Sequence, residues 1–289
     1  MANNIALAKT FVPILDEIYK LASLTSKLDG AAELARQGAN ANELIIPMMS
    51  MDGLADYSRN GGYVQGGVTM TNETVKCNFD RGRRFDVDVM DDLETAGLAF
   101  GRLSAQFIRD KVVPELDAFR FASYCGISGV TKKEETLADG AATVAALSTA
   151  VTAMDDEEVT ATGRYLFITP TLLQGINDMD TTKSKKVLEG FEQVIKVPQR
   201  RFYTAIKQLS GKTGEEAGGY TKATGAANIN FAIVQKDALI QYTKHAAPKI
   251  IAPENNPDAD AYVFGYRMVG IAKAYKNMLS GMYFSHDKA

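Results

Sequence analysis

The chain has 289 residues, of which 46% are apolar, and its 32 basic and 35 acidic side chains give a net charge of −3. This apolar content can form a large core in one domain or two closely joined domains, which excludes a disordered chain. Charges of both signs are scattered and nearly cancel, so the chain has no strong field for nucleic acid or an anionic membrane. Any contact with DNA is expected to be weak and independent of base sequence.

Cysteine usage and apolar runs indicate where the protein works. Cys77 and Cys125 are the only cysteines, and their separation matches no metal-binding or redox motif, as expected in a reducing compartment. No run approaches the roughly 20 apolar residues of a membrane helix, and the N-terminus shows no secretion signal. We therefore expect a protein that is made in the cytosol and has no membrane partner.

The N-terminal part divides into an apolar and a polar stretch. Apolar residues recur at helical spacing over residues 5–28, with Pro13 early in the run, which predicts an amphipathic helix with a break or kink. Residues 29–42 are small and polar, and Gly30 and Gly38 are expected helix stops. The apolar stripe has no local partner. It is expected to pack either on a distant surface, such as that of another subunit, or in an ordinary core.

Residues 43–79 have the pattern of a projecting arm. The stretches 43–51 and 68–79 read as two strands. The loop between them carries five glycines, which give the backbone high freedom and little to pack: Gly53, Gly61, Gly62, Gly66 and Gly67. We expect this arm to reach away from the body of the protein.

A strand and an unusually long helix follow the arm. Alternation of Phe85, Val87 and Val89 with aspartates predicts a strand within residues 79–94. Asp91 and Glu94 can satisfy free amide groups at the start of the next helix. That helix is predicted from Leu93 to about Tyr124, with a kink or division at Pro114. It would be roughly 45 Å long, whereas a compact chain of this size has a radius of gyration near 19 Å. This mismatch favours a flat, elongated subunit.

Residues 131–250 read as an α/β module. The pattern predicts a helix over 139–154, a strand over 164–169 and a helix that begins at Pro170. The stretch 207–230 is rich in glycine, threonine and lysine and is predicted to be an exposed, mobile loop.

The C-terminal third is predicted to contain further short elements. We expect a strand over 230–235 and a short helix from Asp237 to about His245. A turn from Pro253 to Asp260 then leads into 262–284, which reads as a hairpin of two strands broken at Asn277 to Gly281.

Motifs for catalysis, cofactors and metals do not appear. The sequence GKT at 211–213 lacks the glycine that a phosphate-binding loop needs five positions earlier, where Ile206 stands. The two histidines, His245 and His286, have no partner at metal-ligand or catalytic-triad spacing. Neither a serine-hydrolase elbow nor a dinucleotide-binding turn is present. We therefore predict no catalytic residue, no cofactor and no metal, and a protein that is not an enzyme.

Five segments, taken in order, resemble one family. They are NGGYVQGG (60–67), FDRGRRFDVDVMDDLET (79–95), VVPELDAFRFASY (112–124), KIIAP (249–253) and GYRMVGIAKAYKNMLSGMYF (265–284). Each is weak alone, but their order and spacing resemble the major capsid protein of tailed bacteriophages. The fold of that family is the Hong Kong-type phage coat fold, which is shared with encapsulins and herpesvirus capsid floors.

The resemblance implies an α+β fold in four parts. They are an N-terminal arm (1–42), an extended β-hairpin loop (43–79), a peripheral domain with a long spine helix (80–130 and 254–289) and an axial α/β domain (131–253). It also implies self-assembly into the hexamers and pentamers of an icosahedral head that encloses double-stranded DNA. The protein would then be part of the virion and would be assembled in the host cytoplasm.

The resemblance also implies partners besides further copies of the chain. Only about 42 residues precede the extended loop, so a separate scaffolding protein is expected. The other expected partners are a portal, packaged DNA that is bound non-specifically and, optionally, a decoration protein. The expected contact residues between subunits lie in the loop and in the following strand: Gly53, Tyr57, Arg59, Tyr63, Arg81, Arg83, Arg84, Asp86 and Asp88. For the charged residues of the strand, an equally open interpretation is that they face solvent and make no contact between subunits.

Two other functions stay open on the sequence. An encapsulin-like compartment shell would have the same fold but enclose a cargo enzyme, and the absence of nucleic acid in purified particles would identify it. A cytosolic α/β enzyme or ligand-binding protein would use the glycine-rich loop 53–67 as a lid and would be a monomer or a small oligomer.

Overall fold

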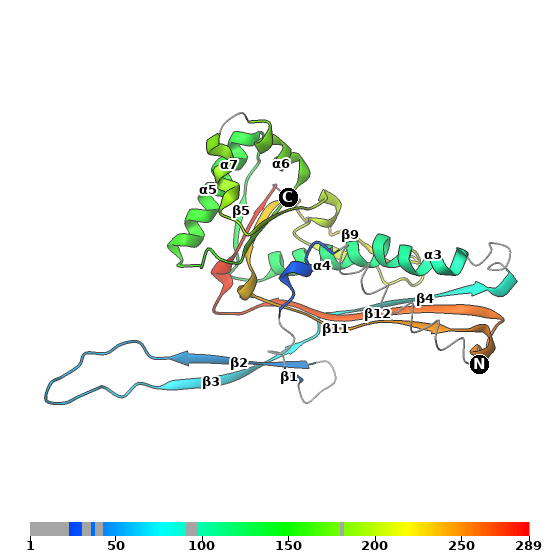
Figure 1. The fold of residues 1–289 in the computed structure, drawn as a ribbon, viewed down its shortest axis with the longest axis horizontal. Coiled ribbons are helices and arrows are strands. Elements are labelled where there is room, and N and C mark those ends of the chain that lie inside the picture. Colours follow the sequence, from blue (N-terminus) through cyan, green and yellow to red (C-terminus); the bar gives the residue numbers. More distant parts are fainter. Residues whose placement is uncertain (1–22, 31–35, 38–42, 91–97, 180–181, 289) are drawn as a thin grey trace.

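The computed structural model describes residues 23–30, 36–37, 43–90, 98–179 and 182–288. It is a mixed α/β structure in which a two-stranded arm projects from a body built on two sheets (Figure 1). Of the predicted helix over 5–28, residues 5–22 lie outside the described residues, and the described part contains only the 3₁₀ turn Ser26–Leu28. The helix start at Asp91 and Glu94 also lies outside the described residues.

The arm is a β-hairpin with a long open end. Its strands are β2 (Glu43–Met51) and β3 (Val68–Lys76), and the short β1 (Arg36–Gln37) pairs with β2 at the root. β2 and β3 pair antiparallel in one register, from Glu43 opposite Lys76 to Met51 opposite Val68. This pairing confirms the two predicted strands. Residues 52–67 continue beyond the last pair and form the far end of the arm (Figure 1).

A three-stranded antiparallel sheet carries the long helix. The strands, in spatial order, are β11 (Leu239–Ile251), β12 (Ala261–Ala274) and β4 (Phe79–Asp88). The helix comprises α3 (Leu98–Phe107), a π-helical turn (Ile108–Val112) and α4 (Val113–Gly126). Alternate residues of β4 face this helix, and Phe79 packs with Ile108 and Leu116 in a shared core. The predicted strand within 79–94 is thus confirmed.

The predicted interruption of the helix lies just before Pro114. Proline has no backbone N–H to give to the carbonyl group four residues earlier, and the wider π-helical turn at Ile108–Val112 precedes it. The helix then continues to Gly126.

A second sheet has five strands. In spatial order they are β5 (Thr131–Glu134), β13 (Met282–His286), β10 (Ile229–Gln235), β6 (Arg164–Ile168) and β7 (Gln193–Lys196). The helices α5 (Gly140–Asp156), α6 (Pro170–Asn177) and α7 (Thr182–Glu189) pack against one face. The structure confirms the predicted elements at 139–154, 164–169, 170 onward and 230–235. Asp139 caps α5 by accepting a hydrogen bond from the backbone N–H of Ala142.

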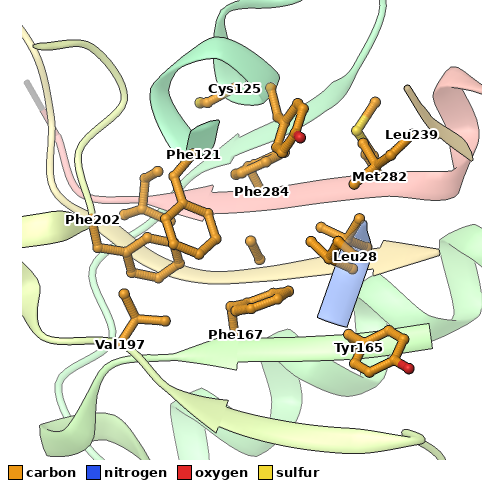
Figure 2. Packing of buried hydrophobic residues seen from close by; sticks show 14 of the residues in the cluster. Leu28, Phe121, Cys125, Tyr165, Phe167, Val197, Phe202, Leu239, Met282 and Phe284 are labelled. Carbon is orange, nitrogen blue, oxygen red and sulfur yellow. The ribbon is translucent and has the colours of Figure 1, made fainter. Parts of the chain in front are cut away.

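The second half of α4 covers the other face of this sheet. Tyr165 and Phe167 of β6 point toward α4, whereas Leu166 and Ile168 point toward the α5–α7 side. Figure 2 shows Phe121 of α4 against Phe167 and Phe202. Since the first half of α4 packs on the three-stranded sheet, this single helix joins the two sheets.

The predicted helix from Asp237 to His245 is wrong. Only a 3₁₀ turn, Lys236–Ala238, is present, and Leu239 begins β11. β11 pairs with β12 over twelve positions, from Leu239 opposite Ala274 to Ile251 opposite Val263. Pairing with a distant strand has overridden the local pattern.

The predicted hairpin over 262–284 is also wrong. β12 lies in the three-stranded sheet and β13 in the five-stranded sheet, and the two strands do not pair. The break at Asn277 to Gly281 carries the chain from one sheet to the other. In the observed pairing, β11 belongs to the sheet of β4, and β13 belongs to the sheet of β6.

The stretch 207–230 is more ordered than a simple loop. It contains most of a small hairpin, β8 (Ile206–Gln208) and β9 (Tyr220–Lys222), and the first residues of β10. Its middle part is largely exposed, as predicted, but Ala227 and Ile229 are buried. Short 3₁₀ turns complete the fold at Ser26–Leu28, Gln199–Arg201, Pro253–Asn255 and Leu279–Gly281.

Helices α5 and α6 approach so closely at Gly140 that a side chain there should destabilise the fold. A Cβ atom on Gly140 would overlap the carbonyl group of Gly175. We expect Gly140→Ala to lower the free energy of unfolding by about 1–3 kcal/mol, because the helices must separate. Urea unfolding followed by circular dichroism measures this. Gly190→Ala is the control, since no atom lies within 4 Å of its added Cβ. Equal stability of the two variants would contradict the expectation.

Candidate functional site

The far end of the arm exposes large apolar side chains. Leu54 is 108% exposed and Tyr63 90% exposed, and the rings of Tyr57 and Tyr63 are tilted against each other at a centroid distance of 4.9 Å. The exposed large apolar residues of the arm are Met49, Met51, Leu54, Tyr57, Tyr63, Val64, Val68 and Met70. Surfaces of this kind mark sites of interaction with other proteins.

The loop has local order but no support from the body. Ser58 and Gly62 form a backbone bridge, and Asp52 Oδ2 accepts a hydrogen bond of 2.7 Å from the N–H of Gly67. The sequence-predicted contact residues Gly53 and Arg59 are exposed in this loop. A Cβ atom on Gly53 would meet no atom within 4 Å. The structure therefore holds the loop in shape and leaves its surface open.

The root of the N-terminal part is held on α4 by a buried polar cluster, here called the clasp: Ser23, Thr25, Asp29, Asp117, Arg120 and Gln241. Asp117 is fully buried and accepts hydrogen bonds from Ser23 Oγ (2.9 Å) and Thr25 Oγ1 (2.7 Å). It also accepts from the backbone N–H groups of Leu24 and Thr25 and from Arg201.

Arg120 and Gln241 complete the clasp from the other side. Arg120 is 2% exposed and donates to Thr25 Oγ1 at 2.8 Å and to Asp29 Oδ1 at 3.2 Å. Gln241 donates to the Thr25 carbonyl oxygen and to Asp29 Oδ1, both at 2.7 Å. Leu28 beside them lies in the core with Tyr165 and Met282 (Figure 2). The clasp thus holds residues 23–29 on the body.

Sequence reasoning missed the clasp. Its signal was present in the charged residues Asp117 and Arg120, which interrupt the apolar face of the long helix three residues apart. Charged side chains in such positions are paired when they are buried. Their partners Thr25 and Thr243 are 92 and 123 residues away from Asp117 and Arg120 in the chain and carry no local pattern.

The charged residues of β4 divide into two groups. Arg81 and Arg83 lie on the face toward the helix, where Arg81 Nε donates to Glu115 Oε1 at 2.8 Å. Arg81 also donates to the carbonyl oxygens of Leu209 and Gly219, and Arg83 donates to that of Glu216. These two arginines therefore hold the β8–β9 hairpin on β4.

Burial raises the pKa of the Glu115 carboxyl group, and the Arg81 charge opposes that rise. Gly218 of the hairpin has φ +64°, and a Cβ there would come within 2.8 Å of the Arg83 guanidinium. The positive φ favours glycine at this position.

The remaining charged residues of β4 face solvent. Arg84 pairs with Asp86 at 2.8 Å, and both side chains are about half exposed. Asp88 accepts a hydrogen bond from the N–H of Met90. The structure thus brings the predicted strand residues together in one strand, but it does not bring them near the predicted loop residues of the same chain (Figure 1).

A cavity of about 1270 Å³ lies between β4, the long helix and the β8–β9 hairpin. Arg81, Arg83 and Glu115 line it together with aromatic and aliphatic side chains such as Phe107, Tyr220 and Met268.

The described part of the chain contains no group of three or more histidine, cysteine or acidic side chains placed to hold a metal ion. His245 is exposed, and His286 is half-buried with its Nδ1 next to the Asp287 carbonyl oxygen. Among the described helices, none has both the length and the apolar character to cross a bilayer.

The two cysteines are free and differ in burial. Burial raises the pKa of the Cys125 thiol from 9.0 to about 11, with a small opposing effect of Lys132, and burial also raises the pKa of Cys77. Because the folded pKa of Cys125 lies above the unfolded value, its contribution to stability is complete below pH 9 and is lost as the pH rises toward 11.

We therefore expect iodoacetamide to alkylate half-buried Cys77 in the folded chain and to leave Cys125 unmodified until the chain is unfolded in urea. Mass spectrometry of the two peptides measures the difference. Equal modification of both thiols in the folded protein would show that the α4 end opens readily.

Comparison by sequence identifies no relative: no family model matches the chain. No curated protein matches it either.

Comparison by structure does find relatives of the fold. The virus-like particle from Pyrococcus furiosus superposes with a TM-score of 0.60 over 96% of this chain and 99% of that chain, at 10% identity. A chain from Gordonia phage Cozz has a TM-score of 0.60 over 92% and 87%, at 11% identity. The capsid of cyanophage P-SCSP1u has a TM-score of 0.58 over 88% and 86%, at 12% identity. This chain has the phage major capsid fold.

The likeness to capsid structures covers nearly the whole chain, which confirms the resemblance seen in the sequence. At least 88% of this chain is covered in each of the three comparisons. At these identities the likeness concerns the fold alone.

Proposed function

We propose that the chain is the major capsid protein of a tailed phage and that its copies form the hexamers and pentamers of an icosahedral head around double-stranded DNA. The observation that carries this proposal is the arm, whose apolar side chains, such as Leu54 and Tyr63, are uncovered by their own chain. The capsid fold supports the same function.

Assembly would cover the exposed strand edge and the exposed apolar side chains of the arm. The strands β2 and β3 and the loop 52–67 form a thin ribbon, and no strand among the described residues pairs with the outer edge of β3. Such an edge is prone to wrong pairing in a lone chain. In a closed shell every such edge and apolar surface faces an identical neighbour. A standard interface buries about 1,600 Å² in total, and several weak contacts on one subunit act together.

We propose contact residues in the two regions that the sequence indicates. The loop residues Gly53, Tyr57, Arg59 and Tyr63 would lie on a neighbouring copy. The solvent-facing Arg84, Asp86 and Asp88 of β4 would make ionic contacts between subunits, whereas Arg81 and Arg83 already bind the β8–β9 hairpin of their own chain.

The division into parts also remains a proposal. We propose an N-terminal arm, an extended loop and peripheral and axial domains, with β11 in the peripheral domain and β13 in the axial domain because they pair there. A separate scaffolding protein, a portal, packaged DNA and, optionally, a decoration protein would be the partners. The small net charge suits a wall that must not hold DNA tightly.

Expression of the chain followed by size-exclusion chromatography and negative-stain electron microscopy tests the proposal. We expect large closed particles, or malformed shells that become regular only with a scaffolding protein. A compact monomer under all conditions would overturn the proposal and favour the enzyme or ligand-binding alternative. Nucleic acid inside particles from infected cells would support a phage head. A protein cargo in its place would identify a compartment shell.

A further inference from the structure

The cavity between β4, the long helix and the β8–β9 hairpin carries a local excess of positive charge. Six basic and three acidic side chains line it, although the whole chain has a net charge of −3. All three carboxylates are already paired with arginines: Asp80 with Arg267, Asp110 with Arg109 and Glu115 with Arg81.

Four of the six cations have no carboxylate partner among the described residues. Arg84 pairs with Asp86 and Arg81 with Glu115, which leaves Arg83, Lys111, Arg200 and Lys222. Arg83 and Lys222 donate only to neutral oxygens, those of the Glu216 carbonyl and the Asn228 side chain. Cations gathered in this way attract an acidic group.

Apolar side chains share the lining with these cations. Leu103, Phe107, Pro114 and Met268 contribute to the wall, and Tyr203 and Tyr220 stand near the basic side chains. An occupant must therefore cover apolar surface as well as neutralise charge. The volume of about 1270 Å³ exceeds the usual range of small-molecule sites, which reaches about 1,000 Å³. A segment of polypeptide fits both the size and the mixed chemistry.

Other polyanions and other parts of this chain fit less well. A DNA backbone offers phosphates but would leave the apolar wall uncovered. The exposed loop of the arm has apolar side chains, but it is only weakly acidic, because the positive charge of Arg59 offsets part of the negative charge of Asp52 and Asp56. The turn 253–260 is acidic and lacks large apolar residues.

We propose that this cavity binds an acidic, partly apolar peptide segment of a separate partner protein. Arginine and lysine groups would bind its carboxylates, and its apolar side chains would cover Phe107 and Met268. The cavity is formed within one subunit, so the inference goes beyond the proposed shell function and does not depend on assembly.

Fluorescence anisotropy with the full-length chain tests the proposal. The probe is a fluorescein-labelled synthetic peptide that alternates glutamate and leucine. We expect it to bind, and to bind less tightly as salt is raised. Matched peptides with glutamine for glutamate, or serine for leucine, should bind at least about tenfold more weakly.

Charge-reversal variants locate the site. Lys111→Glu and Lys222→Glu should each weaken binding of the glutamate–leucine peptide by at least about tenfold. Lys212→Glu is the matched control, because Lys212 is exposed on the same hairpin but outside the cavity, and it should bind as the unaltered chain does. Circular dichroism and particle formation show that each variant folds and assembles, which keeps this test separate from that of the proposed function.

Three results would overturn the proposal. One is equal binding of the glutamate and glutamine peptides, or no binding at all. Another is an unchanged affinity in both cavity variants. The third is tighter binding of another probe: a single-stranded oligonucleotide would assign the cavity to nucleic acid, and a peptide copied from residues 51–64 or 86–95 would assign it to a second copy of this chain.

Discussion

Asp117→Ala is expected to lower the free energy of unfolding by about 3–5 kcal/mol. The fully buried carboxylate accepts hydrogen bonds from Ser23, Thr25 and Arg201 and from two backbone N–H groups. Its removal leaves these donors, one of them charged, without their acceptor in a site that water does not reach. The N-terminal part would also lose its attachment to α4. Urea unfolding of the unassembled chain, followed by circular dichroism, measures the change.

The matched control is Asp156→Ala at the end of α5. Asp156 is exposed, so its loss should change the free energy of unfolding by no more than about 0.5 kcal/mol. Asp117→Asn keeps the shape of the side chain without its charge and should lie between the two. If Asp117→Ala were as stable as the control, the clasp would not hold the N-terminal part.

The double variant Leu54→Asp, Tyr63→Asp is expected to abolish particle formation and to leave the subunit folded. Both side chains are at least 90% exposed, and Tyr63 packs on Tyr57 of the same loop, so the body of the subunit keeps its packing. Each would stabilise a contact by about 1.5–3 kcal/mol if fully buried against a neighbour. This contact free energy is lost at every subunit of the shell. The introduced carboxylates also make burial of the loop against a neighbour unfavourable. Negative-stain microscopy and size-exclusion chromatography measure assembly, and circular dichroism measures folding.

Gln65→Asp is the control for this variant. It adds a negative charge to the same exposed loop without removing an apolar side chain, so particles should still form. Normal shells from the double variant would mean that the arm is not an assembly surface. Failure of both variants would mean that charge alone, and not apolar contact, governs the loop.

Elements with a strong local pattern could be predicted from the sequence. The alternation at Phe85 and Val87 lies in β4, the helix predicted over 139–154 is α5, and Pro170 starts α6 where expected. The two strands of the arm were also predictable, since the glycine-rich loop separates two β-type runs. In each case neighbouring residues in the chain supply the interactions that define the element.

Elements that depend on distant partners were not predictable. Residues 239–245 have a helix-like pattern, yet they lie in β11 because β12 supplies the hydrogen bonds. β13 follows β12 after a short break, yet it pairs with β10 and β5 in the other sheet. The cavity, too, exists only because the β8–β9 hairpin docks on Arg81 and Arg83.

The sequence by itself determined the arm, the long helix and the absence of familiar catalytic motifs, because periodicity and glycine content are properties of neighbouring residues. The tertiary structure alone decided which strands share a sheet and which hydrogen-bond partners Asp117 and Arg120 have. It also decided that the cations without a carboxylate partner gather around the cavity. Those features arise from contacts between segments up to 216 residues apart, such as the Gln241 hydrogen bond to the Thr25 carbonyl. Such a contact leaves no pattern in the local sequence, because it stabilises the protein only after both segments have been brought together by folding.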